Sequence, residues 1–331
     1  MELRARPAAE GAVELNSASP FTDSSATPLA PGKFVDPGWT AKGDRRATVT
    51  LGSLQTLWLN TGTLCNLACK SCYIESSPRN DALLYLTLDE AERFLDELRE
   101  PIEIGFTGGE PFMNPDIVAM LEGALRREHR VLVLTNAMRP MRRHEAALRD
   151  LAARNPGSIT LRVSLDHHTQ AVHEAERGAR SWGQAIEGLL WIARNHIPHA
   201  VAGRQLPGES EAEARAGYAG LFESIGLVLD ANDPAVLVIF PEMDATADVP
   251  EISEGCWDIL GVTPAITMCA SSRMVVHRRG QPAAEVAACT LLPYDEQFLL
   301  GTSLFGARPT VALNHPHCAR FCVLGGASCS G

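Results

Sequence analysis

Short apolar runs alternate with amphipathic stretches between residues 57 and 240. The order is strand then helix, repeated six times. This alternation implies parallel strands joined by helical crossovers. The fifth strand has the weakest pattern. The predicted strands are residues 57–60, 102–106, 131–135, 159–163, 200–202 and 236–240.

Recognisable start signals support the register of the helices. Thr87 and Glu90 form a predicted capping box, and Asn114 precedes Pro115 at the first predicted position of the next helix. In architectures of this kind the chemistry lies on loops that leave the C-terminal ends of the strands. We therefore expect an α/β fold, a partial (β/α)6 TIM-like barrel that is open at one side, with a small cysteine-rich C-terminal domain.

Two segments flank the barrel pattern, which we assign to residues 46–245. Residues 1–45 are rich in Ala, Pro, Ser, Thr and Gly and lack periodicity, which predicts a flexible N-terminal arm without chemistry. Residues 246–331 are irregular and dense in cysteine, which predicts a separate auxiliary domain. Its cysteines are Cys256, Cys269, Cys289, Cys318, Cys322 and Cys329.

Composition narrows the class of protein. The 331 residues are 45% hydrophobic and 21% charged, and no apolar run is long enough to cross a bilayer, so we expect a soluble globular protein with no membrane partner. The opening segment lacks an export signal, which favours the cytoplasm. Nine cysteines in a reducing compartment indicate metal or redox chemistry. A net charge of −11 without a basic stripe argues against nucleic acid.

Three cysteines follow the first predicted strand on one compact loop. Cys65, Cys69 and Cys72 have the spacing C-x3-C-x2-C, so three thiolates can converge on one cluster. A cubane cluster has four irons, and three ligands leave one iron open to a cofactor or substrate. A structural zinc site would normally close with a fourth ligand nearby, but the closest histidine, His129, lies far along the chain.

This loop, with aromatic Tyr73 directly after the third cysteine, resembles the radical S-adenosylmethionine superfamily. The resemblance implies a 4Fe-4S cluster whose open iron is chelated by the amino and carboxylate groups of S-adenosylmethionine. It also implies that electron transfer cleaves the cofactor to a 5′-deoxyadenosyl radical, which abstracts hydrogen from a substrate. A reductant such as flavodoxin or ferredoxin would supply the electron.

Later segments extend the resemblance. Residues 107–111, TGGEP, resemble the GGEP motif, whose glycines let the backbone approach the methionine moiety and whose carboxylate can accept from its ammonium group. Residues 163–166 resemble the ribose-contacting segment, and residues 173–182 resemble a segment whose arginine pairs with the cofactor carboxylate. The implied cofactor-binding residues are Tyr73, Gly108, Gly109, Glu110, Ser164, Asp166 and Arg177.

The later cysteines resemble the twitch extension, a shortened SPASM domain that holds an auxiliary cluster. The resemblance implies one auxiliary 4Fe-4S cluster, although the later cysteine pair is spaced by three residues. Cys329 could replace a member of that pair, and Cys256 is read as a buried thiol. The implied ligands are Cys269, Cys289, Cys318 and Cys322.

Several polar residues have two interpretations. His315 and His317 flank Cys318 and could form a mixed zinc site with Cys322. A second set, three histidines after the fourth strand, could face the cavity as acid–base groups or be ordinary surface or helix-start histidines. A third set, two acidic residues after the sixth strand, could contact a polar substrate or lie in a solvated turn. The second set is His167, His168 and His173, and the third is Glu242 and Asp244.

The expected function is that of a radical enzyme acting on a small polar metabolite. A fully cysteine-ligated auxiliary cluster has no vacant site, so it would accept an electron, which favours a two-electron oxidation. One alternative is maturation of a ribosomal peptide or protein. An alternative of another class is an inactive binding protein stabilised by zinc or by an iron–sulfur cluster.

Overall fold

The computed structural model describes residues 18–241 and 243–326. Its centre is an eight-stranded sheet with the order β7-β6-β5-β4-β3-β2-β8-β9. Every neighbouring pair from β7 to β8 is parallel, and β9 is antiparallel to β8. The sheet is not closed into a barrel. The strands are β2 (Thr56–Asn60), β3 (Glu103–Thr107), β4 (Arg130–Thr135), β5 (Ile159–Ser164), β6 (His199–Arg204), β7 (Leu237–Phe240), β8 (Ser272–Val276) and β9 (Glu285–Ala287).

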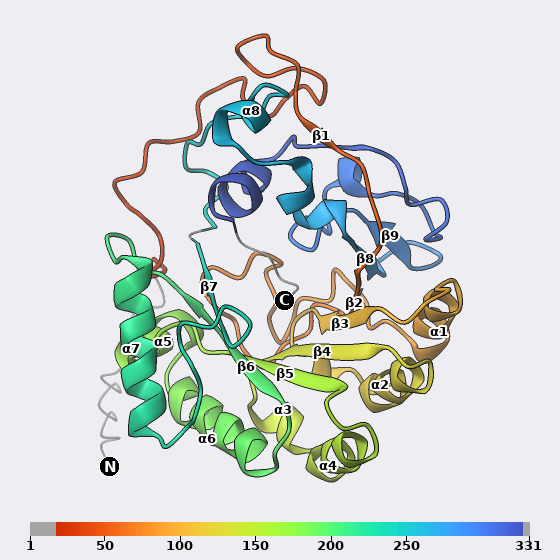
Figure 1. Ribbon diagram of the computed structural model, residues 1–331, viewed down its shortest axis with the longest axis vertical. Helices are drawn as coiled ribbons and strands as arrows, with labels where there is room; N and C mark the ends of the chain where they lie inside the picture. Colours follow the sequence, from red (N-terminus) through yellow and green to blue (C-terminus); the bar gives the residue numbers. More distant parts are fainter. Residues whose placement is uncertain (1–17, 242, 327–331) are drawn as a thin grey trace, which may run out of the picture.

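The helices that connect the strands lie along the outside of the curved sheet (Figure 1). This placement leaves the inner face and the C-terminal ends of the strands free for a site. Among the described residues, no helix is long and apolar enough to pass through a membrane. The helices are α1 (Leu88–Asp96), α2 (Ile117–Arg126), α3 (Arg139–Arg142), α4 (Glu145–Arg154), α5 (Gln170–Arg177), α6 (Ser181–Arg194), α7 (Glu211–Ser224) and α8 (Cys256–Leu260).

Successive side chains of β2 point to opposite faces of the sheet, and each face contributes to a separate hydrophobic core. Leu57 and Leu59 face the crossover helices, whereas Trp58 faces the C-terminal segment. The indole of Trp58 needs a glycine beside it, because a Cβ atom at Gly105 of β3 would lie 2.3 Å from its ring. The C-terminal segment is thus packed against the sheet by large apolar side chains, which stabilise this contact by removing apolar surface from water.

The predicted strands are all confirmed, including the weakly patterned fifth one, which is β6. The capping box of Thr87 and Glu90 is present at the start of α1. The predicted start of the next helix is wrong, because α2 begins at Ile117 after Asp116. The Asn114 side chain still accepts from the Asp116 N–H at 2.8 Å in the turn before α2, and it donates to the carbonyl oxygens of Thr61 and Leu86, which holds the loop against the end of β2.

The C-terminal segment extends the same sheet rather than only flanking it. Strand β8 pairs in parallel with β2, and β9 turns back along β8. A small second sheet joins β1 (Thr48–Val49) to β10 (Val311–Ala312). Short 3-10 turns and a π-helix over Cys318–Leu324 complete this part of the chain. Cys329 and Glu242 lie outside the described residues.

The described part of the N-terminal arm makes defined contacts. The backbone N–H of Leu29 donates to the Thr246 carbonyl oxygen at 2.7 Å, and Lys33 pairs with Asp248 at 2.6 Å. Arg46 pairs with Glu251 at 2.6 Å, and both of these side chains are buried. Leu29 and Lys33, which belong to the predicted flexible arm of residues 1–45, and the adjoining Arg46 therefore lie against the segment that follows β7.

Candidate active site

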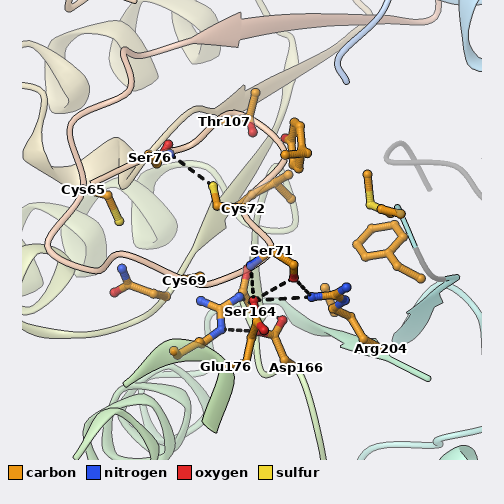
Figure 2. A pocket seen from close by; sticks show the side chains of 18 of the residues that line it. Cys65, Cys69, Ser71, Cys72, Ser76, Thr107, Ser164, Asp166, Glu176 and Arg204 are labelled. Carbon is orange, nitrogen blue, oxygen red and sulfur yellow. Dashed lines mark hydrogen bonds and ion pairs between the residues drawn. The ribbon is translucent and has the colours of Figure 1, made fainter. Parts of the chain in front are cut away.

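The C-terminal ends of β3–β7 surround a cavity of about 180 Å³. Cys65, Cys69 and Cys72 all line it, on the loop that follows β2 (Figure 2). Backbone N–H groups of this loop donate to sulfur, from Leu67 to Cys65 and from Ser76 to Cys72. The structure therefore brings the predicted cysteine triplet to one place.

The three thiols fit an iron–sulfur cluster by their chemistry as well as their position. Burial raises the pKa of Cys65 to about 11 and the pKa of Cys69 to about 12. Both thiols would stay protonated at neutral pH without a metal, because no cation in contact with them outweighs the cost of burying a thiolate. Metal binding displaces these protons, since the thiolate is the ligand.

Gly108 and Gly109 line the same cavity, directly after β3. A Cβ atom at Gly108, whose φ is +130°, would lie 2.5 Å from the Gly62 carbonyl oxygen, and one at Gly109 would lie 2.3 Å from the Leu64 carbonyl oxygen. Backbone hydrogen bonds from Gly109 to Gly62 and from Glu110 to Leu64 join the two loops. The glycines are therefore required first by the close approach of the cysteine loop itself.

The Glu110 carboxylate is turned away from the cavity. It is almost fully buried and accepts hydrogen bonds from the Thr135 hydroxyl at 2.9 Å, the Asn136 N–H at 2.8 Å and the Phe112 N–H at 3.2 Å. Burial raises the pKa of Glu110 to about 7, although these hydrogen bonds oppose the shift. Glu110 thereby fastens the end of β4, where Thr135 and Asn136 themselves line the cavity.

The other predicted cofactor-binding residues also line the cavity. Tyr73 and Ser164 are among them, with Asp166 and Arg177. The Arg177 guanidinium donates two hydrogen bonds to the Asp166 carboxylate, at 2.6 and 3.0 Å. Burial disfavours the charged carboxylate, but Arg177 outweighs it and holds the pKa of Asp166 below its usual value. The two residues that the sequence assigned to separate parts of the cofactor thus form one ion pair.

A family model described as the Radical SAM superfamily matches residues 59–216. The chain belongs to the radical SAM superfamily. The match covers the cysteine loop, the glycine turn and the Asp166–Arg177 pair. Members of this superfamily bind a 4Fe-4S cluster and S-adenosylmethionine, and the cavity of this radical SAM protein gathers the residues expected for both except Glu110.

Two curated relatives are similar to part of this chain. The chain is 31% identical over 136 residues to the antilisterial bacteriocin subtilosin biosynthesis protein AlbA of Bacillus subtilis, which is 40% of this chain and 29% of AlbA. It is 32% identical over 131 residues to the mycofactocin maturase MftC of Mycobacterium tuberculosis, 39% of this chain and 32% of MftC. The matches therefore span about a third of these relatives.

Solved structures show the same fold at low identity. SuiB of Streptococcus suis, bound to S-adenosylmethionine, has a TM-score of 0.54 at 12% identity, covering 75% of this chain and 63% of SuiB. Native anSMEcpe with bound AdoMet has a TM-score of 0.52 at 14% identity, covering 75% of this chain and 77% of anSMEcpe. Both comparisons support the open, partial-barrel architecture.

The histidines after β5 do not line the cavity. His167 and His168 stack on each other with ring centroids 4.0 Å apart, and His173 is fully buried edge-on to Trp182. The interpretation as cavity-facing acid–base groups is therefore wrong, because the chain turns outward after Asp166. Asp244 accepts from the N–H and hydroxyl of Thr246, which matches the turn interpretation.

Three polar or charged residues of the site form a group that the sequence did not predict, although the resemblance extends weakly to Arg204. Ser71 lies between the second and third cysteines, Glu176 precedes Arg177, and Arg204 ends β6. All three line the cavity and contact one another (Figure 2). Their sequence signal is weak, since each becomes significant only through contacts with distant segments.

A second, apolar cavity gathers four later cysteines. Among its other lining residues are Phe298, Val311, Leu313 and His317. Burial raises the pKa of Cys318 well above its usual value and also raises the pKa of Cys269. Cys256 is absent from this lining and its sulfur accepts from the Ser253 N–H at 3.3 Å. The four lining cysteines are Cys269, Cys289, Cys318 and Cys322.

Proposed function

We propose that this protein is a radical SAM enzyme that modifies an apolar side chain of a peptide or protein. The observation that carries the proposal is the composition of the cavity wall. All charged residues that line it are paired with each other, Asp166 with Arg177 and Glu176 with Arg204. Part of the wall is apolar, because Phe240, Met243, Leu291 and Phe321 also line the cavity.

This wall favours a peptide over the small polar metabolite expected from the sequence. A polyol would need buried hydrogen-bond partners, because burying an unpaired hydroxyl is costly. An apolar side chain presented by a peptide needs none. The names of the relatives support this reading: MftC is a maturase, AlbA serves biosynthesis of a bacteriocin, and SuiB has been solved with its precursor peptide SuiA at a TM-score of 0.55.

Cys65, Cys69 and Cys72 would hold the cluster, while Gly108, Gly109, Ser164 and the Asp166–Arg177 pair would hold the cofactor. When bound, the two groups supply a 5′-deoxyadenosyl radical that takes hydrogen from a substrate. The residues of this chain have three tasks. They orient the cofactor, they keep water away through the apolar wall, and they present the substrate C–H bond.

The four-cysteine cavity would hold an auxiliary iron–sulfur cluster in a twitch-like extension. Four thiols in an apolar surrounding provide complete cysteine ligation. Such a cluster has no open iron, so it would supply electron transfer, which favours an oxidation. His317 lines the same cavity, so the mixed Cys/His zinc site is the alternative that metal content must decide.

Metal content and cofactor cleavage test the radical proposal. Anaerobically purified protein should contain about eight irons if both clusters are of the four-iron type. Dithionite-reduced protein should release 5′-deoxyadenosine from S-adenosylmethionine. Zinc with little iron, or no release of deoxyadenosine from iron-loaded protein, would contradict the proposal.

Substrate class is tested by stimulation of that cleavage. Short blocked peptides with one central valine, leucine or phenylalanine should accelerate release of deoxyadenosine, and the same peptides with aspartate at the centre should not. Stimulation by a polyol such as inositol and not by the peptides would overturn the peptide proposal while leaving the radical proposal intact.

A further inference from the structure

One buried carboxylate connects the cysteine loop to the N-terminal arm. Glu176 of α5 is 1% exposed. Its carboxylate accepts from the Ser71 N–H at 2.9 Å, the Ser71 hydroxyl at 2.7 Å and the Ser19 hydroxyl at 2.5 Å. Its backbone carbonyl oxygen accepts from the Lys70 N–H at 3.1 Å. Glu176 therefore fastens the stretch of the loop that joins Cys69 to Cys72.

Arg204 joins the same network from β6. Its guanidinium donates to the Ser71 hydroxyl and lies 3.6 Å from the Glu176 carboxylate (Figure 2). Its other face stacks on Phe21, with 4.1 Å between the guanidinium carbon and the ring centroid. Phe21 is fully buried. A stacked, desolvated guanidinium of this kind is held by both its charge and its planar face.

Because Glu176 neutralises Arg204 and Asp166 neutralises Arg177, the network needs no external anion. Its geometry fits positioning better than ligand capture. The rest of the arm is anchored separately, since Leu29 and Lys33 contact the segment after β7. Loss of the Ser19 and Phe21 contacts would thus loosen the wall of the cavity without detaching the arm.

We infer that residues 19–21 of the N-terminal arm are positioning residues of the S-adenosylmethionine site. Ser19 and Phe21 hold Glu176 and Arg204 in place, and these two hold the loop that carries Cys69 and Cys72. The inference rests on the proposed function. Its physical reason is that reactive groups tolerate little misplacement, since about 1 Å can cost about a hundredfold in rate.

The first test needs no cofactor. Hydrogen exchange of the full-length, metal-free protein is compared for wild type, Phe21→Ala, Ser19→Ala and the control Val35→Ala, which changes a residue of the same arm that is 74% exposed. Both test variants should speed exchange at residues 65–77, because the Lys70 and Ser71 N–H groups donate to Glu176, while β3–β5 exchange unchanged. Unchanged exchange at residues 65–77 in both variants would overturn the inference.

The second test uses the iron-loaded protein. Phe21→Ala should raise the KM for S-adenosylmethionine or lower kcat for deoxyadenosine release about tenfold or more. It should also alter the change that S-adenosylmethionine makes in the electron paramagnetic resonance spectrum of the reduced cluster. Phe21→Met, which refills the buried space with an apolar side chain and adds no polar group, should recover most of both losses.

The two tests separate this inference from the function it depends on. If wild-type protein fails to cleave the cofactor, the proposed function fails. The hydrogen-exchange result still shows whether Ser19 and Phe21 hold the cysteine loop in place. Should Phe21→Ala not fold, Ser19→Ala removes only a hydroxyl and decides alone. Wild-type kinetics and spectrum in Phe21→Ala, in a folded protein that cleaves the cofactor, would refute a positioning role.

Discussion

Replacing Gly109 by alanine should displace the loop that carries the three cysteines. The new Cβ atom would lie 2.3 Å from the Leu64 carbonyl oxygen, 2.7 Å from the Leu64 carbonyl carbon and 2.8 Å from the Thr63 carbonyl oxygen. All three are backbone atoms, so no side-chain rotation relieves the overlap. An ordinary contact of about 3.5 Å requires a backbone shift of about 1 Å.

The cost can be estimated from the contacts that this shift disturbs. Overpacking of a well-packed region typically costs about 1–3 kcal/mol. The backbone hydrogen bonds from Gly109 to Gly62 and from Glu110 to Leu64 would be stretched, at about 1 kcal/mol each. We expect Gly109→Ala to lower the free energy of unfolding by about 3–5 kcal/mol and to reduce iron uptake, because Leu64 is adjacent to Cys65.

Urea unfolding followed by circular dichroism measures the stability, and anaerobic reconstitution measures iron bound per chain. The matched control is Gly220→Ala in α7, where a Cβ atom would meet nothing within 4 Å. That variant should be about 1 kcal/mol more stable than wild type because alanine favours helix. If Gly109→Ala unfolds at the wild-type urea concentration and takes up iron normally, the close-approach argument is wrong.

Three further outcomes are expected. Burial, helped by the charge of Arg177, lowers the pKa of His173 to about 4 in the folded protein. The stability that neutral His173 contributes is therefore complete above about pH 6.5, the pKa in the unfolded chain, and is lost as the pH falls toward 4. Wild type should therefore lose about 3 kcal/mol more than His173→Leu over this range in urea unfolding, and parallel pH curves would contradict this. Arg46→Met leaves the Glu251 carboxylate buried without its ion pair and should lower the free energy of unfolding by about 3–5 kcal/mol. Lys33→Met removes one member of a partly exposed pair and should lower it by less than about 1 kcal/mol. Equal melting temperatures of the two variants would refute this difference. Cys269→Ala should remove about half of the iron and Cys256→Ala none, as measured by metal analysis; full iron content in the first variant would exclude Cys269 as a ligand.

Local sequence determined the order of strands and helices and the positions of the motifs. A strand or a helix is defined by the period of its own apolar residues, so each of the six predicted strands could be found from a few neighbouring positions. The cysteine triplet, the glycine turn and Asp166 also became visible through their positions at the ends of strands. In each case the relevant information lies within a short stretch of chain.

Only the tertiary structure decided which distant segments meet. Strand β8 joins the sheet beside β2, which lies far earlier in the chain, and nothing local in either strand specifies that partner. Likewise, Glu176 has no distinctive signal in its own helix, and its role depends on tertiary contacts with Ser19 and Ser71. The alternation of apolar and polar positions sets which face of an element is buried, but the choice of partner depends on how all the elements pack together. The cysteine loop could thus be recognised from the sequence, whereas the contacts that hold it in place could not.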